Sequence, residues 1–181
     1  MQFEGEEFGR FIKALEFSAE KHKKQLRKGE ERTPYINHPI QVAKTLWEAG
    51  ETSFTLLVGA LLHDTIEDTQ TTPEEIETLF GKDVLDLVLE VTDDKNLPYQ
   101  ERKRLQIVNA PHKSVEGKLL KLADKICNIN DLVQSPPDWT SERKLQYLEW
   151  AAKVVEGLRG VNAILEAKFD ALYQKGKSFF L

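Results

Sequence analysis

The stretch Leu61-Leu62-His63-Asp64-Thr65-Ile66-Glu67-Asp68 carries an apolar run into a His-Asp pair and then into a Glu-Asp pair. Residues three or four positions apart are neighbours on a helix, so Glu67 would lie one turn beyond His63, and Asp68 one turn beyond Asp64. One imidazole and three carboxylates would then gather near the end of a mostly apolar helix. Because unpaired buried carboxylates are costly, we interpret the cluster as a metal site with a water to activate.

The composition is ordinary for a soluble globular protein, with 40% apolar and 30% charged residues. A length of 181 residues suits one domain with a sizeable core. The net charge of −5 argues against a nucleic-acid surface, although it allows a local basic pocket. The longest apolar run, residues 54–62, is far shorter than the roughly 20 residues that span a bilayer. We therefore expect neither a nucleic-acid nor a membrane partner.

The N-terminal residues and the cysteine content both bear on where the protein is located. The N-terminal residues 1–7 are acidic and contain no apolar segment of the kind that secretory signals carry. The chain has one cysteine, Cys127, so it cannot form an internal disulfide. Both features predict a reducing, cytoplasmic location.

Helical periodicity dominates the rest of the chain, and no pair of strands is apparent. Thr72-Pro73-Glu74-Glu75 is typical of a capping box with proline in the first helical turn, and Gly81 is a helix stop. The pattern predicts a single all-α domain over residues 1–181, without a repeat or a dividing linker. The expected helices cover about residues 6–26, 39–49, 52–68, 73–80, 83–92, 115–133, 141–157 and 161–173, with a basic helix through 101–104.

Four residues have the properties of metal ligands, namely His38, His63, Asp64 and Asp124. They come from three separate elements, as a folded pocket requires. Two imidazoles and two carboxylates form a harder set than zinc-thiolate ligands, and they suit Mn²⁺, Fe²⁺ or another six-coordinate ion with positions left for water and substrate. An isolated His-Asp dipeptide is more often structural, and spacing alone does not place Asp124 beside His63.

The ordered pattern of these four residues resembles the signature of HD-domain metal phosphohydrolases. Flanking motifs resemble, more narrowly, the hydrolase domain of RelA/SpoT homologues: Arg27-Lys28, residues 33–39, 63–68, 91–95 and 121–125. The similarity covers roughly residues 10–165 and is greatest to the stand-alone small alarmone hydrolases, the group that includes the metazoan SpoT homologue. The resemblance implies a single helical bundle of the HD type with the metal site between its helices.

The resemblance also implies an activity. A Mn²⁺-dependent 3′-pyrophosphohydrolase would convert ppGpp to GDP and pyrophosphate, and pppGpp to GTP and pyrophosphate. No synthetase or regulatory domain fits within 181 residues, so we expect a protein that only degrades the alarmone.

Roles for individual residues follow from the same resemblance. His38, His63, Asp64 and Asp124 would carry the metal. The matching Glu-Asp pair, Glu67 and Asp68, would orient or deprotonate the attacking water, as a carboxylate within reach of it can.

The residues expected to bind the nucleotide are Arg27, Lys28, Asn128 and Tyr147. Arg27 can stack on guanine and Lys28 can meet phosphate, whereas Asn128 matches a position near the ribose or phosphate. Without the resemblance, Arg27 and Lys28 belong to a solvated basic face, and Tyr147 is equally a core residue.

Three further positions complete the sequence-based expectations. The stretch Ile129-Asn130-Asp131 replaces a Met-Arg-Thr-like stretch of the long bifunctional enzymes and resembles the small hydrolases instead. Tyr35 could equally be core or rim. His22 is expected to be an ordinary surface or loop histidine.

Two other functions remain open from the sequence. The same site could serve as an NADPH 2′-phosphatase or another nucleotide phosphohydrolase. In a different class, the chain could be a catalytically silent nucleotide-binding regulator. Intact Glu67 and Asp68 argue against the silent regulator, because a degenerate enzyme has no need to keep both ligands and base.

Overall fold

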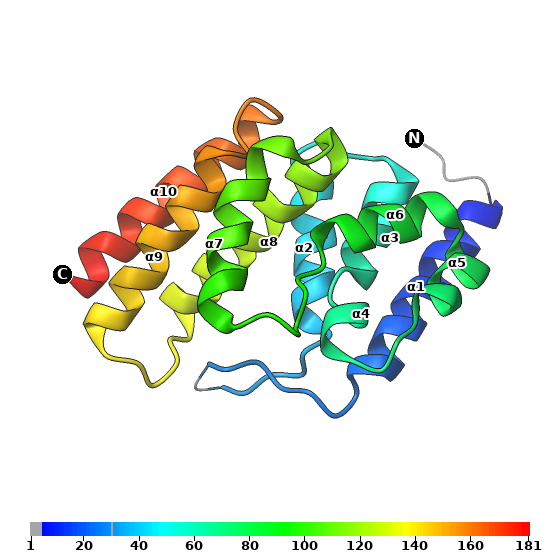
Figure 1. The fold of residues 1–181 in the computed structure, drawn as a ribbon, viewed down its shortest axis with the longest axis horizontal. Coiled ribbons are helices and arrows are strands. Elements are labelled where there is room, and N and C mark those ends of the chain that lie inside the picture. Colours follow the sequence, from blue (N-terminus) through cyan, green and yellow to red (C-terminus); the bar gives the residue numbers. More distant parts are fainter. Residues whose placement is uncertain (1–4, 30) are drawn as a thin grey trace.

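The computed structural model describes residues 5–29 and 31–181, and in these residues ten α-helices and one 3₁₀ helix follow one another without a β-strand (Figure 1). The prediction of an all-α fold is therefore confirmed. None of these helices combines the length and apolarity needed to cross a membrane. The elements are α1 (Gly5–His22), α2 (Asn37–Glu48), α3 (Phe54–Leu62), α4 (Thr65–Asp68), α5 (Pro73–Phe80), α6 (Lys82–Val91), α7 (Tyr99–Asn109), η1 (Ala110–His112), α8 (Val115–Gln134), α9 (Ser141–Glu156) and α10 (Ala163–Phe180).

Helix α8 forms the centre of the bundle, because it packs against α2, α3, α6, α9 and α10. Figure 1 shows α1 and α5 at one end of the long axis, and α9 and α10 at the other. The apolar side chains of α8, among them Leu120, Leu122, Ile126 and Ile129, are fully buried. Asp124 shares this helix, so the fold places one carboxylate close to the middle of the molecule.

The prediction of one helix over residues 52–68 is wrong, because the structure divides it into α3 and α4 with His63 and Asp64 at the corner. The Thr65 hydroxyl donates to the carbonyl of Leu62 at 2.7 Å, and His63 Nδ1 lies 2.8 Å from the carbonyl of Ala60. Side chains that bond the last carbonyls of a helix compete with its backbone pattern and bend it. Both predicted ligands therefore project from a corner.

Several predicted boundaries also shift. Helix α1 ends at His22, and the described residues after it form a bridge between Leu26 and Pro34 and a 3.0 Å backbone bond from Tyr35 N to Gln25 O. Helix α2 begins two residues before Pro39, and α10 runs to Phe180 along α8 instead of ending at 173. The capping box of Thr72 is present, and Gly81 ends α5 with a φ of 94°.

Leu120→Ala is expected to lower the free energy of unfolding by about 2–5 kcal/mol, because the side chain is fully buried in α8 and its removal leaves a cavity. Urea unfolding followed by circular dichroism measures the change. The matched control is Leu89→Ala on α6, where the side chain is 42% exposed and the loss should be about 0.5 kcal/mol. Equal losses at the two positions would contradict the placement of α8 at the centre of the core.

Candidate metal centre and active site

The predicted metal ligands converge from three elements. His38 lies in the first turn of α2, His63 and Asp64 at the corner between α3 and α4, and Asp124 on α8. His38 Nε2 lies 3.2 Å from Asp124 Oδ1, and His63 Nε2 lies 3.0 Å from Asp64 Oδ2. The cross distances are 3.7 Å from His38 Nε2 to Asp64 Oδ2 and 3.9 Å from His63 Nε2 to Asp124 Oδ1. One ligand atom each from His38, His63 and Asp124 fits within 4.8 Å, so this group could hold a metal ion.

The orientation of His63 fits a metal ligand. Its Nδ1 lies 2.8 Å from the carbonyl of Ala60, which requires a proton on Nδ1, so in the neutral ring Nε2 carries the lone pair. That Nε2 is buried and faces Asp64 Oδ2 and Asp124 Oδ1. A buried ring nitrogen facing two carboxylates, with the other ring nitrogen bonded to a backbone carbonyl, is the arrangement expected of a histidine that binds a metal.

The electrostatics of the cluster also favour a cation. Burial lowers the pKa of His38. At His63, Asp64 and Asp124 outweigh burial and raise the pKa to about 9. Burial opposes ionisation of Asp64, yet the adjacent histidines hold the pKa of its carboxyl well below the usual range. The carboxylates thus stay charged and keep a proton on His63, and a divalent ion could replace that proton.

Of the residues expected to bind the nucleotide, Asn128 and Arg27 reach the cluster, but Lys28 does not. Asn128 Nδ2 donates to Asp124 Oδ1 at 2.6 Å, and Arg27 Nη2 donates to Asn128 Oδ1 at 2.9 Å. The same guanidinium is held by Asp131, with 2.7 Å from Nη2 to Oδ2. Lys28 is exposed and makes no ion pair within the described ranges. Sequence reasoning missed the role of Asp131, although its altered stretch, residues 129–131, was the available signal.

Tyr147 belongs to an aromatic wall beside the cluster. Its half-buried ring lies between those of Trp139 and Trp150, with centroid distances of 5.9 and 5.3 Å. Burial, helped by the charge of Asp124, raises the pKa of Tyr147, so its phenol stays protonated. Three cations that were not selected from the sequence lie over this wall. Lys103 Nζ and Lys125 Nζ lie 4.5 and 4.8 Å from the Trp150 centroid, and Arg143 Cζ lies 4.3 Å from the Trp139 centroid.

Glu67 and Asp68 lie in different environments. Glu67 Oε2 accepts the backbone N–H of Asp93 at 3.0 Å, and Arg102 Nη1 lies 3.8 Å from its other oxygen. Burial is the main reason that the pKa of Glu67 is raised, and the charges of Asp93 and Asp64 add to it. Asp68, in contrast, pairs with Lys95 and is more exposed than Glu67. The two carboxylates are therefore not equivalent.

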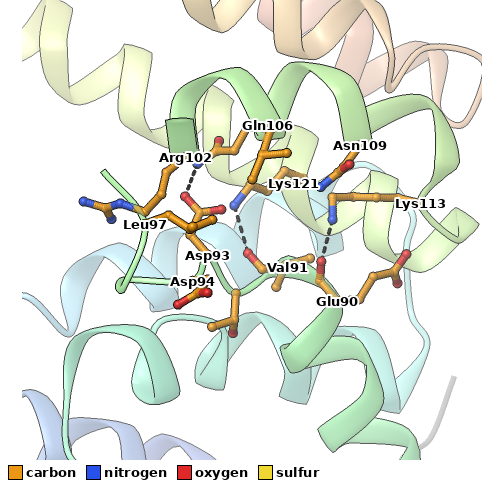
Figure 2. Close-up of a pocket in the computed structure, with 12 residues that line it drawn as sticks. Glu90, Val91, Asp93, Asp94, Leu97, Arg102, Gln106, Asn109, Lys113 and Lys121 are labelled. Atoms are coloured by element: carbon orange, nitrogen blue, oxygen red, sulfur yellow. Dashed lines mark hydrogen bonds between the residues drawn. The ribbon is translucent and has the colours of Figure 1, made fainter. Parts of the chain in front are cut away.

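A cavity of about 210 Å³ lies between the end of α6, α7 and α8, and Figure 2 shows the residues that line it. Asp93 and Arg102, which contact Glu67, belong to its wall. Gln106 Nε2 donates to Asp93 Oδ2 at 2.5 Å, and Lys121 Nζ donates to the carbonyl of Val91 at 3.0 Å. These bonds hold the loop after α6 and, through the Asp93 N–H, the side chain of Glu67.

Tyr35 also belongs to the site, where its hydroxyl donates to Asp64 Oδ2 at 2.7 Å. The expectation that His22 is a surface or loop histidine is wrong. His22 is only 2% exposed, and its ring stacks on Tyr35 with centroids 4.8 Å apart. The chain turns back after α1, and this turn brings the end of that helix under the segment before His38. The sequence contained a signal that Tyr35 belongs to the site, because Tyr35 lies only three residues before the predicted ligand His38.

The model of the HD domain family matches residues 14–152, a range that contains all four predicted metal ligands. The chain belongs to the HD-domain family. The resemblance of its motifs to HD-domain hydrolases is thereby confirmed.

Known relatives of this HD-domain protein match nearly its whole length. The guanosine-3′,5′-bis(diphosphate) 3′-pyrophosphohydrolase MESH1 of Xenopus tropicalis is 56% identical over 164 residues, which cover 90% of this chain and 92% of the relative. The human MESH1 protein is 52% identical over 173 residues, covering 94% and 97% of the two chains. A solved structure of a metazoan SpoT orthologue that hydrolyses ppGpp aligns with a TM-score of 0.92 and 48% identity over 100% of both chains.

Proposed function

We propose that this HD-domain protein is a hydrolase that converts ppGpp to GDP and pyrophosphate, and pppGpp to GTP and pyrophosphate. The observation that carries the proposal is the buried Nε2 of His63, which faces the carboxylates of Asp64 and Asp124 at 3.0 and 3.9 Å where three elements meet. Relatives more than 50% identical over at least 90% of the chain are named for this activity, which supports the choice of substrate.

We assign the cofactor as Mn²⁺, held by His38, His63, Asp64 and Asp124. This set of two imidazole nitrogens and two carboxylate oxygens contains no thiolate, which favours a six-coordinate ion over structural zinc. A bound divalent ion lowers the pKa of water and neutralises phosphate oxygens. We place the reaction in the cytoplasm, where a lone reduced cysteine such as the buried Cys127 is ordinary.

Glu67 is the base in this proposal, and Asp68 positions the site. A general base must be unprotonated yet basic enough to accept a proton from the attacking water, and desolvation gives Glu67 that property. The Asp93 N–H fixes one carboxylate oxygen of Glu67 at 3.0 Å. Asp68 is paired with Lys95, and this ion pair suits a group that stays charged and holds its neighbours in place.

The surroundings of the cluster suit a substrate with two separate anionic groups. The 3′-diphosphate would lie at the metal ligands, beside Asn128. The second diphosphate would meet Lys103 and Arg143 over the aromatic wall, and burial together with neighbouring Lys125 and Arg143 already lowers the pKa of Lys103. An anion there would relieve this mutual repulsion. Tyr147 and Arg27 would contact the nucleoside, and Lys28 would approach a phosphate from the surface.

Arg27→Ala is expected to raise KM for ppGpp about 10- to 100-fold and leave kcat within about threefold, because the loss of one charge-assisted contact costs roughly 1.5–3 kcal/mol of binding. Steady-state release of pyrophosphate measures both constants. The matched control is Lys24→Ala, an exposed cation of the same basic segment, which should change neither. An unchanged KM in Arg27→Ala would return this residue to a structural pair with Asp131.

Product analysis tests the proposed function. Metal-stripped protein receives Mn²⁺ or buffer, together with ppGpp or, in parallel, NADPH. GDP and pyrophosphate formed only with Mn²⁺ would support the proposal. Phosphate released from NADPH without turnover of ppGpp would keep the site and overturn the substrate. Binding of ppGpp without turnover of either nucleotide would favour the silent regulator.

A further inference from the structure

Tyr35 lies between two residues with different proposed roles, Asp64 and Asp68. Its hydroxyl lies 2.7 Å from Asp64 Oδ2 and 3.3 Å from Asp68 Oδ2. One phenol thus faces both a proposed metal ligand and the carboxylate one turn later. The phenol is the donor in these contacts, because an ionised carboxylate only accepts hydrogen bonds.

The ring of Tyr35 is held from three sides. His22 stacks on it with an interplanar angle of 29°, and Arg27 Cζ lies 5.5 Å from its centroid. The edge of His38 approaches it at 5.9 Å between centroids. At the backbone, Tyr35 N donates to Gln25 O at 3.0 Å. A ring with this many neighbours has little freedom, so its hydroxyl is a fixed point beside the cluster.

The oxygen of Asp64 that Tyr35 holds is the one that faces the histidines. Asp64 Oδ2 lies 3.0 Å from His63 Nε2 and 3.7 Å from His38 Nε2. The phenol therefore fixes an oxygen that lies within reach of both imidazoles. Removing the hydroxyl would leave this oxygen without the hydrogen bond that orients it.

We propose that Tyr35 is a positioning residue that holds Asp64 in the orientation needed to bind the metal and ties it to Asp68. The inference rests on the metal site of the proposed function, but it does not depend on the identity of the substrate. Tyr35 acts through Asp64 and touches neither the ion nor the reacting atoms. Outer groups that orient a metal ligand typically contribute 10- to 100-fold to metal affinity.

The test is Tyr35→Phe, which removes the hydroxyl and retains the ring between His22 and Arg27. We expect the dissociation constant of Mn²⁺, measured on metal-free protein by electron paramagnetic resonance of the free ion, to rise about 10-fold or more. At saturating Mn²⁺, kcat should fall while KM stays within about twofold. A thermal melt by circular dichroism checks that the variant is folded.

The matched control is Tyr173→Phe, which also removes a phenol bonded to a carboxylate, Glu149 Oε1 at 2.9 Å, but does so between α9 and α10. It should leave Mn²⁺ affinity and kcat unchanged. Unchanged Mn²⁺ affinity in folded Tyr35→Phe overturns the inference, whatever happens to turnover. If the wild-type protein binds Mn²⁺ but does not hydrolyse ppGpp, weaker binding in Tyr35→Phe still supports the inference while the proposed function fails.

If Tyr35→Phe does not fold, Tyr35→Trp and Tyr35→His provide a second comparison. Both retain an aromatic ring and an N–H donor, but only a donor that reaches Asp64 can restore the contact. Mn²⁺ affinity that follows the presence of a bond to Asp64, seen in the structures of the two variants, supports the inference. Affinity that follows thermal stability alone overturns it.

Discussion

Asp64→Ala is expected to abolish ppGpp hydrolysis and to weaken Mn²⁺ binding by more than 100-fold. Asp64 Oδ2 lies within 3.0–3.7 Å of both histidine Nε2 atoms, so the substitution removes a carboxylate beside both imidazoles. Losing a ligand itself should cost more than the roughly 10- to 100-fold that the loss of an outer partner costs. Calorimetric titration of metal-free protein with Mn²⁺, alongside pyrophosphate release, measures both effects.

The control for this variant is Asp86→Ala on α6, which removes an exposed carboxylate paired with Lys82. It should retain full activity and Mn²⁺ affinity. Full activity in Asp64→Ala itself would contradict the assignment of the metal site. Lost activity with intact Mn²⁺ binding would move Asp64 from the ligands to the substrate contacts.

Glu67→Gln is expected to lower kcat by about 10²–10⁴-fold while Mn²⁺ and ppGpp still bind. The amide keeps the size of the side chain and can still accept the N–H of Asp93, but it cannot take a proton from water. Single-turnover kinetics, together with the binding constants of the metal and the nucleotide, separates chemistry from affinity. Glu77→Gln, an exposed glutamate on α5, is the matched control and should leave kcat unchanged.

The same residue should govern the acid side of the pH profile. Glu67 works as a base only when it is unprotonated, and its pKa is raised, chiefly by burial. Activity should therefore be present above that pKa and fall as the pH decreases through it, with a midpoint above that of an ordinary glutamate. In Glu67→Gln this limb should vanish from the residual activity. A loss in kcat below about threefold, or a retained acid limb, would remove Glu67 from the role of base.

Most of the fold could be predicted because the signals that mark helices are local. The capping box at Thr72, the stop at Gly81 and the apolar face of α8 each depend on residues within a few positions of one another. The corner at His63 could not be predicted in this way. There, hydrogen bonds from His63 and Thr65 to the preceding carbonyls interrupt a run whose composition favours one continuous helix.

The candidate site, too, was predictable in part from the sequence and in part only from the structure. Residue types and their order were enough to select His38, His63, Asp64 and Asp124, because the chemistry of a ligand belongs to its side chain. The packing of the helices determined which of these residues lie close together. The position of α8 against α2 and α3 brings Asp124 to the histidines, and the turn after α1 places His22 behind Tyr35.

Partners across the fold were likewise invisible to local patterns. Asp131 holds Arg27, and the Asp93 N–H holds Glu67, over separations of 104 and 26 residues. A sequence states which groups a chain carries, whereas distances of about 3 Å between distant groups arise only when buried helices pack together. Hydrogen bonds and ion pairs depend steeply on such distances. The candidate ligands could therefore be chosen from the chain, but their orientation and electrostatics came from the packed bundle.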